Sequence, residues 1–96
     1  MHLALMQSIS EIELNRLSQE IPKRVGEQIM LLRKKRNLSQ TELARMVGKD
    51  RQYLYKIEKG KVTPNITTVA ILSTALNVSL SELLSEIKLN FSHKES

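Results

Sequence analysis

Residues 40–59 read QTELARMVGKDRQYLYKIEK, and the spacing within this stretch decides the fold of the chain. Its apolar and small residues form two stripes at a helical period, separated by one glycine: Leu43, Ala44 and Val47, then Leu54 and Ile57. Gly48 stands where a chain that turns sharply between two helices needs a residue tolerant of positive φ. The small Ala44 allows two steeply crossing helices to approach each other. The stretch therefore predicts a helix-turn-helix, whose second helix lies in the DNA major groove.

Several further features continue in register on both sides of this stretch. They are Leu38-Ser39-Gln40, Glu42-Leu43-Ala44, Ile57-Glu58-Lys59-Gly60, Pro64 and Ala75-Leu76-Asn77-Val78-Ser79. With them, residues 25–84 resemble the helix-turn-helix domain of the Xre/Cro-like family, which includes the lambdoid phage repressors. The resemblance implies an all-α, compact five-helix lambda-repressor-like fold, sequence-specific binding of double-stranded DNA, and a homodimer.

Size and composition allow one small domain. The 96 residues suffice for a single core, and with only 3% aromatic residues that core must be aliphatic. The absence of cysteine excludes disulfides and thiolate metal ligands. No apolar run approaches the roughly eighteen residues of a membrane span, and the start MHLALMQSI lacks the features of a signal peptide. We expect a cytoplasmic protein with no membrane contact.

Positive charge is concentrated on the segment that carries the motif. Residues 22–61 hold twelve Lys and Arg against four Asp and Glu, a net of +8, whereas residues 1–21 carry −2 and residues 62–96 carry −1. The formal net charge of the chain is +5. A solvated basic face would explain the charge alone. Its coincidence with the motif indicates a surface for phosphate.

Capping residues divide the chain into three parts: an extra N-terminal helical segment (1–21), a DNA-binding domain (22–88, with the helix-turn-helix at 40–59) and a C-terminal tail (89–96). Ser10 is expected to cap a helix that ends near Gln19. Pro22 is expected to begin the first domain helix, which runs to about Arg36, because the missing N–H of proline is unpaired at that position anyway. Further N-caps are expected at Ser39, Asp50, Asn65 and Ser79, and a left-handed C-cap at Gly60.

The proposed reading helix, from about Asp50 to Lys59, carries the candidate base contacts. If its apolar residues face the core, Arg51 and Gln52 in the first turn reach base edges, where Arg pairs with guanine and Gln with adenine. Lys56, one turn later, reaches a base or a phosphate. The resemblance places these three residues at base-reading positions.

Contacts to the DNA backbone are expected from a wider set: Gln40, Tyr53, Tyr55, Lys59, Lys61 and Arg36. By resemblance, Gln40 also braces a side chain at the start of the reading helix. The run from Arg33 to Arg36 opposes the negative end of its helix dipole, and it can also reach phosphates. The resemblance further implies a structural ion pair between Arg33 and Glu58.

The last predicted helix is short and strongly apolar. A helix of this kind near the end of a small domain has spare hydrophobic surface, and in the family that surface often makes the dimer. The expected dimer contacts are Leu80, Leu83, Leu84 and Ile87. Residues 1–20 are expected to cover one side of the domain, and a dimer contact becomes plausible there if their apolar residues face outward.

Enzymatic activity is not expected. His2 and His93 have no nucleophile or carboxylate arranged around them, and neither a phosphate-binding glycine loop nor metal-ligand spacing is present. We therefore expect no cofactor and no metal. Three alternatives to an autonomous repressor stay open: the antitoxin of a toxin–antitoxin pair, with residues 1–20 as the toxin-binding surface; a controller of a restriction–modification system; and a protein-interaction module on the same fold.

Overall fold

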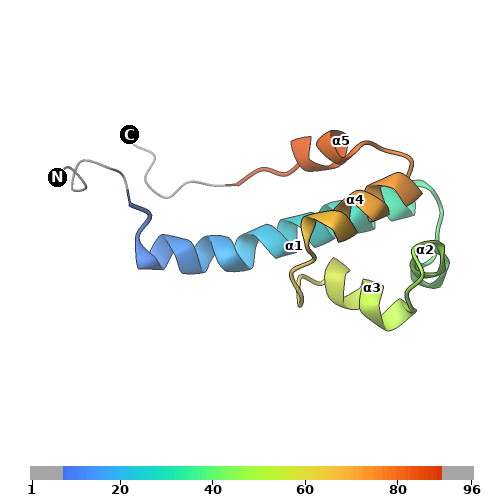
Figure 1. Cartoon of the computed structure of the whole chain (residues 1–96), viewed down its shortest axis with the longest axis horizontal. Coiled ribbons are helices and arrows are strands. Elements are labelled where there is room, and N and C mark those ends of the chain that lie inside the picture. Colours follow the sequence, from blue (N-terminus) through green and yellow to red (C-terminus); the bar gives the residue numbers. More distant parts are fainter. Residues whose placement is uncertain (1–7, 90–96) are drawn as a thin grey trace.

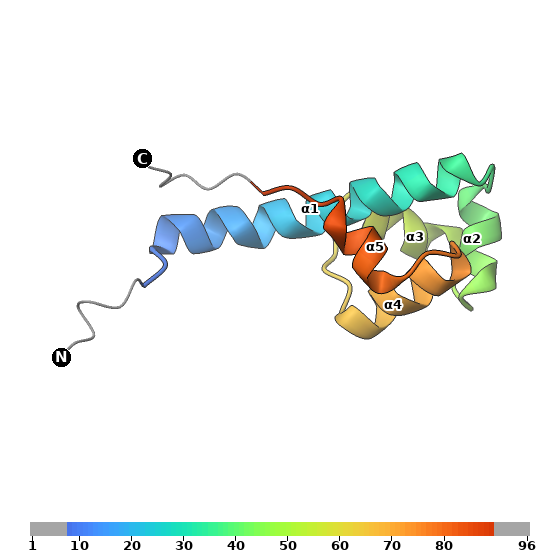
Figure 2. The same cartoon turned by 90° about the horizontal axis from the view of Figure 1, so that it is seen from above.

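In the computed structural model, residues 8–89 are described, and within that range they form five helices and no strand. The helices are α1 (Glu11–Lys35), α2 (Gln40–Met46), α3 (Arg51–Glu58), α4 (Ile66–Ala75) and α5 (Leu80–Ser85). In Figure 1, α3 and α5 lie on opposite sides of the C-terminal half of α1, and in the view from above α5 runs from α1 to α4 (Figure 2). The predicted all-α, five-helix fold is confirmed.

Residues 1–7 and 90–96 lie outside the described part of the chain, and with them most of the predicted tail and both histidines. Among the helices of residues 8–89, none is long and apolar enough to cross a membrane.

The first helix is longer than predicted. Ser10 caps it as expected, its hydroxyl accepting from the Glu13 N–H at 3.0 Å. The helix then continues through Pro22 instead of ending near Gln19 and starting again, so the predicted break is wrong. Proline leaves the carbonyl of Ser18 without its helical donor, but Ser18 is exposed and water can replace that donor.

An ion pair spans the proline. Arg24 donates to Glu20 at 2.8 Å, four residues back and across Pro22, and to Glu27 at 3.2 Å, three residues on. Pairs at these spacings stabilise a helix, by about 0.2–0.5 kcal/mol each in peptides. The extra N-terminal segment is therefore an extension of α1, although the division of the chain into domains at residue 21 stays a prediction.

The helix ends follow one pattern. All five expected N-caps are present, each side chain accepting from the N–H three residues on: Ser10, Ser39, Asp50, Asn65 and Ser79. Four C-termini end in left-handed residues, Gly48 and Gly60 with φ of 73° and 71°, and Asn37 and Asn77 with φ of 56° and 61°. At Gly48, the N–H bonds to the Arg45 carbonyl and the next N–H bonds back to Ala44, which closes a Schellman motif. The positive φ predicted for Gly48 and the left-handed cap predicted at Gly60 are confirmed.

The core lies where α1, α3, α4 and α5 meet, and α2 closes it. Its ten buried hydrophobic residues are Val25, Ile29, Leu43, Ala44, Leu54, Ile57, Val69, Leu72, Leu76 and Leu83. Both stripes of the helix-turn-helix contribute, with Val47 half-buried against the cluster. Ile66 and Ile71, on α4, point outward instead.

Gly26 sets how closely α1 and α3 approach. A Cβ at this position would clash with the carbonyl oxygen of Ile57 and lie 2.8 Å from that of Glu58. The two helix backbones are thus in direct contact, and any side chain would push α3 away. The contact fixes the C-terminal end of α3 against α1.

Candidate nucleic-acid interface

Capping hydrogen bonds fix the first residue of both helices of the helix-turn-helix. Ser39 and Glu42 form the predicted capping box, with the Glu42 N–H donating to the Ser39 hydroxyl at 3.0 Å and the Ser39 N–H donating to the Glu42 carboxylate at 2.8 Å. These hydrogen bonds, first of all the one from the Ser39 backbone, lower the pKa of Glu42. Asp50 starts α3 by accepting from the Tyr53 N–H at 2.9 Å. The cap therefore fixes the residue at which α3 begins after the turn that follows α2.

A buried ion pair anchors α3 to α1. Arg33 Nε and Nη2 donate to the two carboxylate oxygens of Glu58 at 2.6 and 3.0 Å, and Nη1 donates to the Leu38 carbonyl at 2.8 Å. The side chains are 9% and 2% exposed. Both charges are paired and hydrogen-bonded, which is the condition under which buried ions are tolerated. The ion pair implied by the family resemblance is present.

Gln40 connects this pair to the surface. Its amide nitrogen donates to Glu58 at 3.0 Å, and its amide oxygen accepts from Arg51 Nη1 at 3.0 Å. A carboxylate only accepts and a guanidinium only donates, so the two neighbours allow one orientation of the amide. Arg33, Glu58, Gln40 and Arg51 form a continuous polar network, which holds the Arg51 guanidinium over the first turn of α3.

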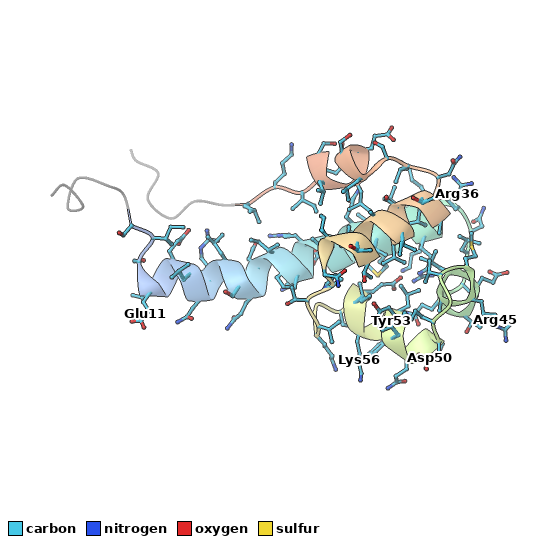
Figure 3. All side chains as sticks on the ribbon, in the orientation of Figure 1. Glu11, Arg36, Arg45, Asp50, Tyr53 and Lys56 are labelled. Carbon is cyan, nitrogen blue, oxygen red and sulfur yellow. The ribbon has the colours of Figure 1, made fainter. Side chains whose placement is uncertain are left out.

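The outer face of α3 carries the predicted base-reading residues. Leu54 and Ile57 are fully buried, which leaves Arg51, Gln52 and Lys56 exposed on the remaining surface. In Figure 3, Lys56 projects from the edge of α3 that lies away from α1. Arg51 uses one of its five N–H donors on Gln40, and its exposed position leaves the others accessible to a ligand on this face.

Two tyrosines position lysines around α3. The Lys49 ammonium lies 5.0 Å from the ring centre of Tyr53, and those of Lys59 and Lys61 lie 5.9 and 5.5 Å from the ring centre of Tyr55. Both tyrosines are half-buried, so packing restrains their rings, and each ring attracts the lysine ammonium groups beside it through cation–π contacts. The arrangement gathers positive charge at both ends of the reading face.

Arg36 lies apart from this surface. Its Nη1 donates to the Leu76 carbonyl at 3.0 Å, where it satisfies an unpaired carbonyl at the C-terminus of α4. Figure 3 places Arg36 well apart from Asp50, Tyr53 and Lys56. The predicted backbone contact by Arg36 gains no support from this position and stays a prediction, and Arg33 in the same run is buried in its ion pair.

The structure removes one residue from the predicted dimer surface on α5, and the rest of that surface stays a prediction. Leu83 is fully buried in the core of its own domain, so it cannot contact a second copy. Leu80 and Ile87 are half-buried against the same core, and of the four residues Leu84 alone is exposed, at 38%. The helix uses its apolar side to close the domain.

Within residues 8–89, no group of three or more His, Cys, Asp or Glu side chains could hold a metal ion. Sequence reasoning missed one positioning residue, Gly26, and gave another contact incompletely. Gly26 gave no turn or cap signal, because its requirement comes from α3, far along the chain. The link between Gln40 and Arg51 was expected only in outline, as a brace for an unnamed side chain.

Comparison with known proteins agrees with this geometry. The chain is 37% identical over 70 residues to the control protein C.MunI of a Mycoplasma species, which covers 72% of the chain and 95% of that protein. It is 34% identical over 62 residues to the immunity repressor protein of Bacillus phage phi105, but that match covers 65% of the chain and 43% of the repressor's length. Among solved structures, the restriction-modification controller protein C.AhdI from Aeromonas hydrophila matches with a TM-score of 0.63 and 32% identity, over 66% of this chain and 96% of that one.

The helix-turn-helix family model matches residues 29–83, more than half of the chain, and that range contains α2, the turn, α3 and the whole polar network. The chain therefore belongs to the Xre-type helix-turn-helix family of DNA-binding transcription regulators.

Proposed function

We propose that this chain is a repressor that binds a pseudo-palindromic operator in double-stranded DNA as a homodimer. The observation that carries the proposal is the polar network, which fixes an exposed arginine at the start of α3 through a buried ion pair. A guanidinium held in place in this way loses less freedom on meeting a base than a free side chain does. Two copies of α3 would enter successive major grooves about 34 Å apart.

Sequence choice is assigned to the outer face of α3. Arg51 donates to O6 and N7 of a guanine, and Gln52 pairs with N6 and N7 of an adenine. Lys56, one turn further along, donates to a base edge or a phosphate. A wrong base pair at any one of these contacts is expected to cost about 1–3 kcal/mol.

Affinity is assigned to the residues around that face. Gln40 has a second amide N–H beyond the one that it gives to Glu58, and this donor is suited to a phosphate. Lys59 and Lys61, supported by Tyr55, and the hydroxyls of Tyr53 and Tyr55 complete the proposed backbone set. Neutralised phosphates release counterions, so binding should weaken steeply with salt.

Selection of bound sequences from a random duplex pool, at moderate salt, tests the proposal. An inverted repeat with half-sites one helical turn apart is the expected result. A single half-site would remove the dimer from the proposal. Weak, salt-sensitive binding without a motif would leave only a basic surface and would contradict sequence-specific reading.

A second candidate is a restriction–modification controller. It is favoured by the two controllers named above, which match over 95% and 96% of their length, whereas the phage repressor matches over 43%. A reporter fused to the selected operator in its natural context separates the roles. Output that falls steadily with protein level indicates a repressor. Output that rises, with the operator beside a methyltransferase and endonuclease gene pair, indicates a controller. Neither the antitoxin nor the interaction-module alternative gains support from these relatives.

A further inference from the structure

We propose that residues 11–21 of α1, here called the arm, form the dimer interface by packing antiparallel against the arm of a second copy. The inference rests on the proposed dimeric binding and adds the surface that makes the dimer. Both views show the arm running clear of the other helices (Figures 1 and 2). Its side chains therefore have no neighbouring helix of their own domain.

One side of the arm is an apolar stripe. Leu14, Leu17 and Ile21 recur at the spacing of one helix face, and they line an open groove of about 400 Å³ together with Ser18, Pro22 and Thr63. Leu14 is 49% exposed and Ile21 is 40% exposed. By comparison, α5 exposes Leu84 alone among its predicted contacts, and the groove between α1 and α5 is lined by Lys35, Glu82 and Glu86 as well as apolar groups.

Charges beside the stripe favour a second copy in antiparallel orientation. Glu13 and Arg24 flank the stripe on the same side, eleven positions apart. Each is also ion-paired along its own helix, Glu13 with Arg16 and Arg24 with Glu20 and Glu27. If the two-fold axis of an antiparallel pair passes between Leu17 and Ser18, Leu14 of one copy lies opposite Ile21 of the second copy. Glu13 of the first copy then lies near Arg24 of the second copy. A parallel pair would instead set Glu13 beside Glu13 and Arg24 beside Arg24. The antiparallel arrangement also opposes the two helix dipoles favourably.

The length of the arm matches the spacing that the DNA requires. The reading helix α3 contacts α1 at Gly26 and at Arg33. The point midway between these two residues lies about 18 Å along α1 from the centre of the stripe, at a rise of about 1.5 Å per residue. A two-fold axis at that centre doubles the distance to about 36 Å, close to the roughly 34 Å between successive major grooves. The stripe also faces at least about a third of a turn away from Gly26, so a second arm leaves α3 uncovered.

Introduced cysteines test the orientation in the full chain, which has no cysteine of its own. Leu14→Cys and Ile21→Cys, each alone under mild oxidation, are expected to stay uncrosslinked, because their own copies lie apart along the pair. A mixture of the two variants is expected to form a disulfide, which needs Cα atoms within about 7 Å. Each variant crosslinking to itself indicates a parallel pair, and no crosslink in any sample means that the arms do not meet. Either result overturns the proposal.

Sedimentation equilibrium of charged variants tests the surface independently. Leu17→Glu is expected to weaken dimerisation at least about a hundredfold, since both copies lose a buried leucine. Ile12→Glu is the matched control, because Ile12 is 81% exposed and lies about half a turn away from the stripe. If Leu84→Glu dissociates the dimer and Leu17→Glu does not, α5 is the interface and the arm is not.

The two proposals fail in different ways. An inverted repeat selected equally by the wild type and by Leu17→Glu, without crosslinking, would leave operator reading intact and overturn the arm interface. Crosslinking of the mixture with no selected motif would support the arm interface and contradict the proposed function.

Discussion

The two halves of α1 differ in what their side chains contact. In the C-terminal half, Ile29 is fully buried and Arg33 is paired with Glu58, so that half is committed to the domain and to the placement of α3. In the N-terminal half, Leu14 and Ile21 face solvent, and the Arg16–Glu13 and Arg24–Glu20 pairs each join neighbouring turns of α1. One helix thus joins a packed unit that carries α3 to an exposed apolar surface, which we propose is covered by a second copy. The contrast predicts that changes in the two halves have separable effects.

The largest effect is expected from breaking the buried ion pair. Glu58→Ala leaves the Arg33 charge buried without its partner, and should lower the free energy of unfolding by about 3–5 kcal/mol. Urea denaturation measures the change. Arg16→Met removes the half-buried Arg16–Glu13 pair of the arm, which joins two residues three apart on one helix. It should lower the urea midpoint far less, since pairs at this spacing are worth only about 0.2–0.5 kcal/mol in peptide helices. Equal losses in the two variants would contradict the contrast between the halves.

Gly26→Ala should come next. The added methyl group meets two backbone carbonyls, which cannot move aside as side chains do, so we expect a loss of about 3 kcal/mol, the upper end of the usual range for overpacking. Gly48→Ala is the comparison, because no atom lies within 4 Å of its would-be Cβ and only the φ of 73° opposes the change. That strain is worth about 1–2 kcal/mol. If Gly48→Ala is the more harmful of the two, the close approach of α1 and α3 is not the limiting contact.

Lys61→Ala should leave stability unchanged and weaken DNA binding for all sequences alike. One phosphate contact fewer reduces the slope of log K against log salt by roughly one unit. Fluorescence anisotropy over a salt series, on a selected and on a scrambled duplex, measures this slope. Arg36→Ala should leave the slope unchanged, because that guanidinium is bound to the end of α4. A reduced slope for Arg36→Ala would return it to the interface.

The smallest effect concerns pH. Hydrogen bonds from Ser39 and Ser79 lower the pKa of Glu42 and of Glu82. A lowered folded-state pKa adds stability above the usual glutamate value of about 4.3 and loses it as the pH falls through the folded value. Urea midpoints should therefore decline in that acid range, and the double variant Glu42→Gln and Glu82→Gln should decline less. Glu11→Gln is the control, because Glu11 carries a carboxylate that belongs to neither capping box. If the double variant declines as much as the wild type, the assignment is contradicted.

The sequence predicts most of the domain because its signals are local. Caps such as Ser39 and Asp50, the left-handed Gly48 and the two apolar stripes each act within a few residues, and the structure contains them as expected. The ion pair between Arg33 and Glu58 came from the family resemblance, since nothing local links residues 25 positions apart.

The errors came from interactions that the local pattern does not contain. Pro22 reads as a helix start, yet the Arg24–Glu20 pair spans it and the helix continues. Nothing in the local pattern shows that Arg36 donates to the Leu76 carbonyl, 40 residues away. Leu83 and Leu84 are adjacent leucines that the sequence does not distinguish. Only the way α5 packs on the core shows that Leu83 is buried and Leu84 is exposed.

Paired selection of bound sequences with the wild type and with Arg51→Ala tests the central claim most directly, namely that the polar network presents Arg51 to a base. The wild type is expected to return an inverted repeat, and Arg51→Ala the same repeat with one relaxed position in each half-site. Gln40→Ala, which removes the brace, should relax that same position in part. An identical motif from wild type and Arg51→Ala would contradict the claim and remove this residue from the reading set.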